Sequence, residues 1–248
     1  MAWQGQRSRA RTPAKAPAAP PPTDGSAVVG ALRPVMSRPE RLIVRVGRAR
    51  VGVATRALAA KVGLEEGCAW TADLASAVAQ CTAALAARDD AERLLSRRAL
   101  SGREVRQRLA RRGHSPAHAE AAARTMETLG LINEQSLAGA IVRGELARKP
   151  AGARLLRSKL ARRGIGAPAA VRAVNDETAG RDAMSDALRL ARHRLGRMSA
   201  ALDPTRVERR LLGLLARRGF DADVCRRAAR RAMAERRGGG GQADAAGA

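Results

Sequence analysis

The sequence has almost no aromatic residues: it contains no tyrosine, one phenylalanine (Phe220) and two tryptophans (Trp3 and Trp70). Proteins that hold single strands by base stacking need several aromatic side chains on one surface, so a stacking platform of that kind is excluded. The absence of tyrosine also excludes a tyrosine nucleophile for strand breakage.

Cysteine is scarce as well, and the three that are present, Cys68, Cys81 and Cys225, are not closely spaced. They form neither the pairs of a disulfide framework nor the short spacing of a zinc knuckle, and they fit a reducing compartment. His114 and His118 are spaced to share one helical face, but no third ligand is near them in the sequence. Packing is therefore the preferred interpretation of this histidine pair, and we expect no metal and no other cofactor.

Motifs for catalysis are missing. No GxxxxGK[ST] loop is present to hold a nucleotide phosphate, and the run at Gly238–Gly241 lies in a tail, where a flexible linker is the expected structure. The acidic residues of the later part of the chain are scattered, and many stand where helix caps are expected, which disfavours a metal-dependent nuclease. The sequence therefore predicts a binding protein with no small-molecule substrate, and not an enzyme.

No apolar run is long enough to cross a membrane. The longest weakly polar stretch, residues 74–87, includes Ser76, Gln80 and Thr82 and falls short of the roughly 20 apolar residues that a spanning helix needs. Residues 1–37 are rich in Arg, Ala and Pro and lack the apolar core of a secretory signal. They are predicted to be a disordered basic tail, with a transit peptide, or a true start at Met36, as alternatives. We expect a cytoplasmic protein with no membrane partner.

Positive charge is what the chain has in excess. It contains 47 Lys and Arg against 23 Asp and Glu, a net charge of +24. Residues 97–237 hold 33 of the basic and 14 of the acidic side chains, so most of the excess lies there. Such a charge predicts a polyanionic partner, and nucleic acid is the leading candidate. Only four of the basic residues are lysines; biased codon usage is an alternative explanation for the preference for arginine, although not for its repeated positions.

The sequence LARRG occurs three times, at Leu109–Gly113, Leu160–Gly164 and Leu215–Gly219. Before the first copy, Ser101 and Glu104 have the spacing of a capping box, which predicts a helix that starts after Ser101. A glycine after such a helix favours the left-handed conformation that stops it. The predicted structural helix stops are Gly113, Gly164 and Gly219.

Alignment of the three copies separates buried from exposed positions. An apolar pair precedes each glycine, and an alanine follows nine residues after it, where it permits close approach of a second helix. The expected buried pairs are Val105/Leu109, Leu156/Leu160 and Leu211/Leu215. With a preceding helix, each copy makes a three-helix unit, and the intervals of 51 and 55 residues between copies are typical of helical arrays.

The predicted fold is mainly α, with three tandem three-helix repeats in an elongated array. The repeats are assigned to residues 71–133 (with a preceding helix), 134–180 and 181–236, followed by a flexible Gly-rich tail at 237–248. Before them, residues 38–70 are predicted to form a small β-hairpin-containing extension. Two β-branched runs around Gly47 predict the hairpin, and residues 55–67 predict a small helix closed by a glycine turn.

The basic positions repeat between the first two copies at an offset of 51 residues. Helical phase turns three of each set away from the apolar pair, so these two units are expected to present similar cationic ridges. In the third copy, Leu212 and Leu214 replace two basic residues, which predicts a more buried helix and a smaller contribution to the ridge. The candidate filament- or DNA-binding residues are Arg103, Arg106, Arg108, Arg111 and Arg112 in the first copy, Arg154, Arg157, Lys159, Arg162 and Arg163 in the second, and Arg209, Arg217 and Arg218 in the third.

Three runs carry a resemblance to known proteins: AERLLSRRALSGREVRQRLARRGHS, LGLINEQSLAGAIVRGELARKPAGARLLRSKLARRGI and ERRLLGLLARRGFD. They resemble the RecX family of regulatory proteins, which control the RecA recombinase. Residues 101–105 match the small, polar and acidic element of the family, and residues 130–134 match its central signature, with Leu137 in place of the usual aromatic residue. The resemblance covers residues 88–235, and residues 40–70 are similar to the extension of longer members.

The resemblance implies a modular protein that inserts into or caps the groove of the RecA–DNA filament. It implies suppression of RecA ATPase, strand exchange and coprotease activity without an active site in the chain itself. The expected partners are the RecA filament and single- and double-stranded DNA. The alternative is a general, sequence-independent DNA-binding or chromosome-coating protein, which would affect the filament only at amounts that cover the DNA.

Overall fold

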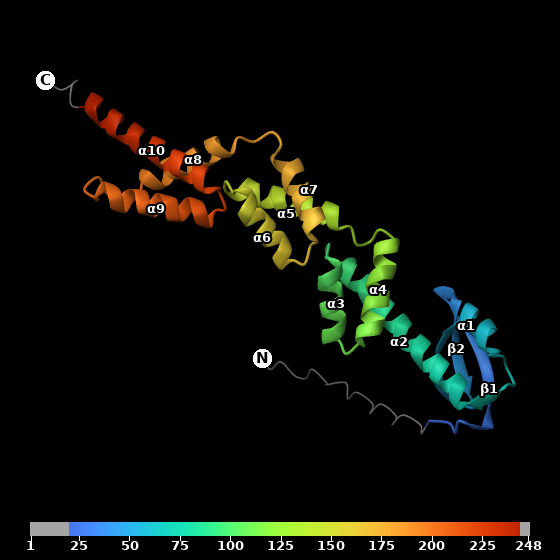
Figure 1. Cartoon of the computed structure of the whole chain (residues 1–248). Coiled ribbons are helices and arrows are strands. Elements are labelled where there is room, and N and C mark those ends of the chain that lie inside the picture. The colour runs from blue at the N-terminus through green and yellow to red at the C-terminus, as the bar shows by residue number, and fades with distance from the viewer. Residues whose placement is uncertain (1–19, 244–248) are drawn as a thin grey trace, which may run out of the picture. The chain divides into compact units, whose positions relative to one another are not determined.

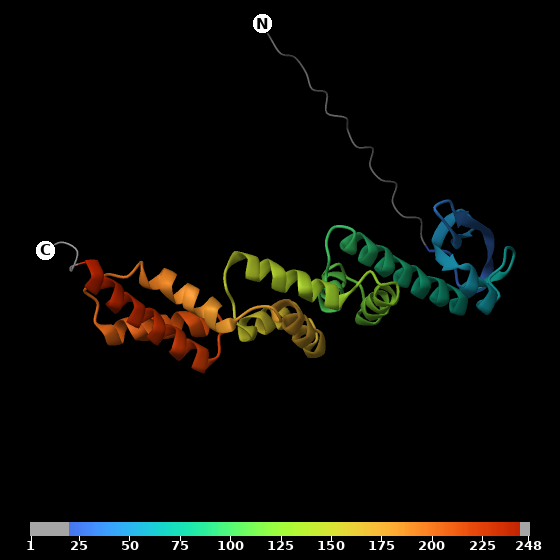
Figure 2. The same ribbon diagram turned by 90° about the horizontal axis from the view of Figure 1, so that it is seen from above.

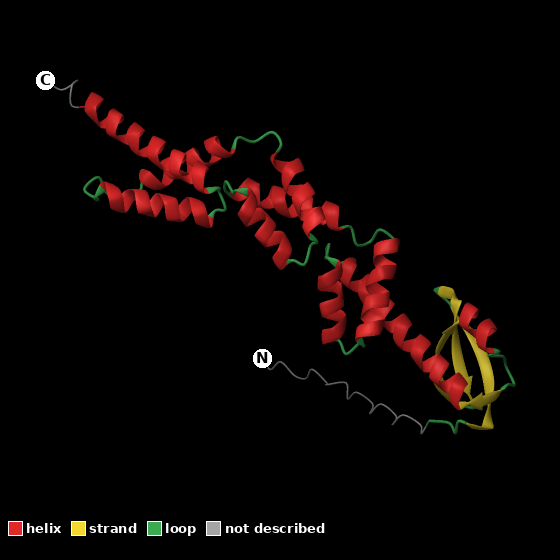
Figure 3. Cartoon of the chain, viewed as in Figure 1, coloured by secondary structure: helices red, strands yellow, loops and turns green. Residues whose placement is uncertain are grey.

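The computed structural model describes residues 20–243 of the chain. The described residues divide into two compact units, the first ending at Ala86 and the second beginning at Ala87. Strands occur in the first unit, whereas the described part of the second is built from helices (Figures 1 and 3). Within residues 20–243, no helix combines the length and the apolar character that a membrane span requires.

The first unit is built on a four-stranded antiparallel sheet in the order β3-β2-β1-β4. The strands are β1 (Asp24–Val35), β2 (Arg38–Val46), β3 (Ala49–Thr55) and β4 (Ala69–Thr71). β2 and β3 form the hairpin predicted around Gly47, whose φ of +53° explains the glycine at this turn. Alternate residues of β2, including Val44 and Val46, are buried and form a core with Trp70 and Val78.

The prediction of a disordered tail over residues 1–37 was wrong for residues 24–37. Residues 24–35 form β1, which pairs with β2 on one side and β4 on the other, and its Val29 is buried in the core of the sheet. The tail was predicted from average composition, which proline and alanine dominate, whereas the strand is stabilised by partners later in the sequence. Residues 1–19 of the predicted tail lie outside the described residues.

Two helices complete the first unit. α1 (Arg56–Val62) is the small helix predicted after the hairpin: the Thr55 side chain caps its start, and Gly63, with a φ of +65°, ends it. α2 (Ala72–Leu95) begins in this unit. The Thr82 hydroxyl on α2 accepts a hydrogen bond from the backbone N–H of Val53 at 2.8 Å, so α2 partly covers the edge of β3.

The second unit consists of three three-helix modules, so the prediction of a mainly helical fold with three such repeats is confirmed. Module 1 combines the end of α2 with α3 (Gly102–Arg111) and α4 (Pro116–Thr128); module 2 comprises α5 (Glu134–Arg148), α6 (Ala153–Arg162) and α7 (Ala167–Thr178); module 3 comprises α8 (Ala183–Leu195), α9 (Pro204–Arg217) and α10 (Ala222–Ala243). Each module has its own apolar core. In module 3, α8 and α9 pack against each other and against α10 (Figure 2).

The LARRG helices are α3, α6 and α9. Ser101 caps α3 through a complete capping box with Glu104. The predicted apolar pairs are buried in all three helices; Val105, Leu160 and Leu215 are 0% exposed. The glycines that follow have positive φ values of +88° at Gly113, +74° at Gly164 and +82° at Gly219. Each module therefore folds around the apolar face of a helix that a glycine ends.

The last helix is longer than predicted. α10 continues to Ala243, so the prediction of a flexible tail was wrong for residues 237–243, while residues 244–248 lie outside the described part of the chain. Each glycine inside a helix costs about 1 kcal/mol relative to alanine, so the run Gly238–Gly241 costs about 4 kcal/mol in sum. Local propensity therefore favours the predicted tail and does not explain the continuation of α10.

Candidate nucleic-acid interface

Several of the predicted binding residues lie free on the helix surfaces. Arg103 and Arg111 of α3 and Arg157 and Arg162 of α6 are exposed, and no ion pair within residues 20–243 holds any of them. Arg111 and Arg162 are the first arginines of their LARRG copies. Modules 1 and 2 therefore present unpaired guanidinium groups at equivalent positions, as the offset of 51 residues predicts.

The two ridges differ at their centre. Arg106 pairs with Glu120 and Glu127 of α4, at 3.4 and 3.7 Å, whereas its counterpart Arg157 has no such partner in the described structure. Arg108, the next candidate on α3, is half-buried. Because the carboxylates of α4 already offset the charge of Arg106, Arg157 is the freer of these two equivalent residues.

The second arginine of each LARRG copy binds a carboxylate. The pairs are Arg112 with Asp90 at 2.9 Å, Arg163 with Glu104 at 2.8 and 2.9 Å, and Arg218 with Glu145 at 3.0 Å. In module 1 the partner belongs to the same module, because no module precedes it. In modules 2 and 3 the partner belongs to the module before. The second arginine therefore links each of these modules to its predecessor.

The junction between modules 1 and 2 joins the start of α3 to the end of α6. The Ser101 hydroxyl donates a hydrogen bond to the backbone carbonyl of Arg163 at 2.5 Å. Glu104, which completes the capping box of α3, also accepts both hydrogen bonds from the Arg163 guanidinium. Gly164 lies against the aliphatic part of Arg103, where a Cβ atom at position 164 would overlap it.

The junction between modules 2 and 3 repeats this arrangement at the start of α6. The backbone N–H of Gly152 donates to the carbonyl of Arg218 at 2.9 Å, and that of Arg154 donates to the carbonyl of Gly219 at 3.3 Å. The Arg218 guanidinium donates to the carbonyls of Lys149 and Pro150, each at 2.9 Å. Position 152 has no room for a side chain, because a Cβ atom there would overlap the backbone of Gly219.

In both junctions the end of one LARRG helix docks on the start of the preceding one. The sequence predicted the helix stops and the charges but not this contact, because the partner lies more than 50 residues away and LARRG itself does not identify it. The one local signal for this contact was Gly152. It stands at the start of a helix, where no helix stop is needed, so its lack of a side chain points to a close neighbour. A binding role for Arg112, Arg163 and Arg218 stays a prediction, and their charges already face carboxylates of the chain.

Glu145 is the acidic centre of the second junction and is only 9% exposed. Its carboxylate accepts hydrogen bonds from Lys159, at 2.5 Å, and from Arg218. The Lys159 hydrogen bond is the main cause that lowers the pKa of Glu145 below its ordinary value of 4.5; burial opposes the shift and Arg218 adds to it. Lys159, a predicted binding residue, is therefore paired within the chain.

The two other acids that hold a LARRG arginine have lowered pKa values as well. Burial raises the pKa of Glu104, but the hydrogen bonds from Arg163 and from the Ser101 N–H outweigh it. Burial likewise raises the pKa of Asp90, and the hydrogen bond to His114 and the charge of Arg112 outweigh it. His114 lies 2.8 Å from Asp90, and the described residues contain no group of three or more potential metal ligands.

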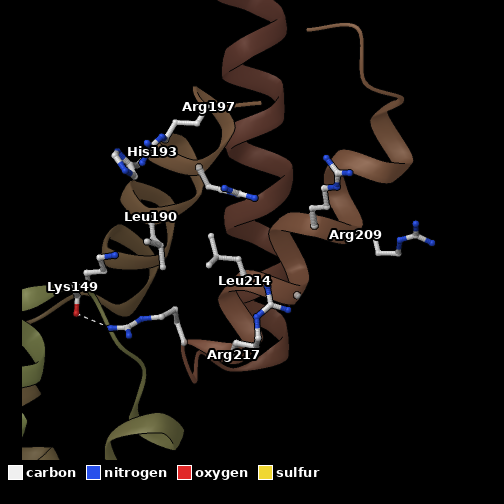
Figure 4. A pocket seen from close by; sticks show the side chains of 11 residues that line it. Lys149, Leu190, His193, Arg197, Arg209, Leu214 and Arg217 are labelled. Carbon is white, nitrogen blue, oxygen red and sulfur yellow. Dashed lines mark hydrogen bonds between the residues drawn. The ribbon is translucent and has the colours of Figure 1, made fainter. Parts of the chain in front are cut away.

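Several unpaired arginines of module 3 line a groove of about 820 Å³ between α8 and α9, which we call the α8–α9 groove. Of the predicted residues, Arg209, Arg217 and Arg218 line it. The sequence reasoning missed Lys149, Arg194, Arg197 and Arg210, which line it as well. Figure 4 shows His193 and Arg197 of α8 on one side and Arg209 and Arg217 of α9 on the other.

Periodicity on α9 alone could not reveal this groove, since its charges come from three separate segments. The sequence predicted a more buried third helix with a smaller contribution to the ridge. Leu212 and Leu214 are indeed half-buried, but the exposed arginines of α9 combine with those of α8. Arg154, by contrast, lies at the junction, where its guanidinium donates to the carbonyl of Ala216 at 3.1 Å.

These features define a class of protein: tandem three-helix modules, coupled end to start, with unpaired arginines on the module surfaces. A family model described as the first three-helix domain of RecX matches residues 87–123. Regulatory protein RecX of Halorhodospira halophila is 38% identical over 146 residues, which are 58% of this chain and 86% of that protein. Regulatory protein RecX of Mycobacterium avium is 34% identical over 135 residues, 53% of this chain and 76% of that protein.

A solved structure shares the fold. The crystal structure of a regulatory protein RecX superposes with a TM-score of 0.65, covering 80% of this chain and 96% of that chain at 17% sequence identity. The chain belongs to the RecX family of regulatory proteins. The family resemblance seen in the three sequence runs is thereby confirmed.

Proposed function

We propose that the chain binds the RecA–DNA filament and inhibits or modulates the recombinase: its ATPase, strand exchange and coprotease activities. Membership of a family of regulatory proteins supports a regulatory role. The observation that carries the proposal is the pair of exposed, unpaired arginines on α6, Arg157 and Arg162, with exposed arginines at related positions of α3. In this proposal the chain acts in the cytoplasm, without catalysis or a cofactor.

The junctions explain how separate modules act together on a filament. Each junction fixes the end of one LARRG helix on the start of the preceding one, so the arginine ridges of neighbouring modules keep a defined spacing. A partner with repeated phosphates and acidic side chains can then engage several modules at once, which raises the effective concentration of each later contact. Binding releases counterions and weakens steeply with salt.

A second candidate function is a general DNA-binding or chromosome-coating role. The net charge of +24 and the unpaired arginines of the α8–α9 groove favour it, because both attract any nucleic acid. The two functions differ in the amount of protein required. A filament regulator acts at a small fraction of the amount that covers the DNA, whereas a coat acts only near coverage.

The contribution of the α6 arginines to inhibition of RecA is tested by the charge-reversing double substitution Arg157→Glu/Arg162→Glu. Each arginine is expected to contribute a charge-assisted contact of about 1.5–3 kcal/mol, so the double variant should need at least about tenfold more protein to inhibit RecA. The measurement is single-strand-dependent ATP hydrolysis by RecA. The matched control reverses Arg226 and Arg227 of α10, which are equally exposed but pair with Asp223 at 3.8 and 3.6 Å. Equal losses for both double variants would reject the ridge.

A further inference from the structure

Several arginines of module 3 outside the α8–α9 groove have acidic partners. Arg192 binds Glu235 at 2.7 Å, Arg181 and Arg189 bind Asp186 at 2.7 and 2.9 Å, and Arg231 binds Glu235 at 3.2 Å. Arg206 and Arg237 are exposed outside the groove without an ion pair in the described residues. The Arg192 hydrogen bond is the main cause that lowers the pKa of Glu235, to about 2. The carboxylates of the module are therefore used away from the α8–α9 groove.

The α8–α9 groove has no acidic lining residue. Five of its arginines are exposed and have no ion pair within the described residues: Arg194, Arg197, Arg209, Arg210 and Arg217. Positive groups gathered in one concavity repel one another, and two low-dielectric walls strengthen the field between them. This surface is complementary to a ligand that carries several negative charges in a row.

The floor of the groove shows which part of such a ligand it fits. Leu190 and Leu214 lie between the cationic walls, and the lining contains no Phe, Tyr or Trp; its one ring is the imidazole of His193 (Figure 4). Gly213 leaves space for the neighbouring guanidinium, because a Cβ atom there would lie 3.2 Å from Nη1 of Arg217. A single imidazole among five guanidinium groups is no stacking platform for successive bases, so the lining favours contacts with a sugar–phosphate backbone.

We propose that the α8–α9 groove binds the sugar–phosphate backbone of a single nucleic-acid strand, with its bases turned outward. Arg210 and Arg217 are two helical turns apart, about 10 Å along α9. The two guanidinium groups are therefore placed to contact different phosphates of one strand. Guanidinium groups approach from α8 and α9 at once, which suits a lone strand; a duplex has its bases on the inner side of each backbone.

This assignment rests on the nucleic-acid partner of the proposed function and deepens it by naming the form of nucleic acid that this groove takes; its test requires no RecA. The test uses the full chain and a short fluorescent oligothymidylate, with binding measured by anisotropy over a series of salt concentrations. The variant Arg194→Gln/Arg210→Gln removes one charge from each wall. We expect at least a tenfold loss of affinity at low salt. We also expect the slope of log affinity against log salt to fall by about 1.4, for two lost phosphate contacts on a single strand.

The matched control is Arg226→Gln/Arg227→Gln, which removes the same charge from α10 of the same module. A loss for the groove variant no larger than for this control would overturn the proposal, and so would an equal loss on a duplex of the same length. The midpoint temperature of thermal unfolding should be no lower for the groove variant than for the unaltered chain, because neutralising crowded like charges relieves repulsion. RecA is absent from this experiment. A negative result would therefore reject the groove assignment without deciding the outcome of the RecA assay.

Discussion

Replacement of Gly219 by alanine is expected to destabilise the chain by about 2–5 kcal/mol, because two separate costs combine at this position. The φ of +82° is left-handed, which disfavours any residue with a Cβ atom. The added Cβ would also overlap the backbone N–H and the side chain of Leu155 on the preceding LARRG helix. The measurement is the free energy of unfolding in urea, followed by circular dichroism.

Two other glycines separate these costs. Gly113 has a φ of +88° but open space around its Cβ position, so Gly113→Ala tests the backbone cost alone, about 1–2 kcal/mol. Gly152 has an ordinary φ of −82° but lies against Gly219, so Gly152→Ala tests the overlap alone, about 1–3 kcal/mol. The loss at Gly219 should exceed both. If Gly219→Ala costs no more than Gly113→Ala, the helix stop has no role in coupling modules 2 and 3.

Replacement of Glu145 by glutamine is expected to destabilise the chain by about 2–4 kcal/mol near neutral pH. The change keeps the volume of the side chain but removes the charge that Lys159 and Arg218 share, and hydrogen bonds to charged groups contribute about 1.5–3 kcal/mol each. It leaves two cations facing each other in a part of the junction where Glu145 is nearly enclosed.

The effect of this substitution should depend on pH in a defined direction. The pKa of Glu145 is below its ordinary value of 4.5 in the folded chain, so its contribution to stability is complete above that value and is lost as the pH falls through the lowered pKa. The difference in unfolding free energy between the unaltered chain and Glu145→Gln should therefore shrink in acid. Glu127→Gln is the control: its pair with Arg106 is half-exposed, and we expect a loss below about 1 kcal/mol. A loss at Glu145 that equals this control at every pH would contradict the described junction.

Local signals in the sequence were enough for much of the fold. The Ser101 capping box, the buried pairs of the LARRG helices and the glycine of the β2–β3 turn each depend on residues within a few positions of one another. The strand β1 was missed because its partners are β2 and β4, and average composition carries no information about pairing of that kind.

The candidate site was predicted less completely, for the same reason. Helical phase on α3 and α6 identified Arg111, Arg157 and Arg162 as outward-facing. It could not show that Arg163 and Arg218 are used in junctions, because Glu104 and Glu145 lie in preceding modules. Helical phase also could not predict the α8–α9 groove. Its cations come from α8, α9 and Lys149 before α6, and they lie close together only in the folded chain.

The central claim is that the chain acts on the recombinase filament and not merely on DNA. The direct test is ATP hydrolysis by RecA on single-stranded DNA, titrated with the chain at fixed moderate salt, with binding to the bare DNA measured in parallel. The account predicts inhibition at amounts of the chain far below those that cover the DNA. Inhibition that appears only when the DNA is saturated, or no inhibition at all, would contradict it and would favour the charge-driven coat.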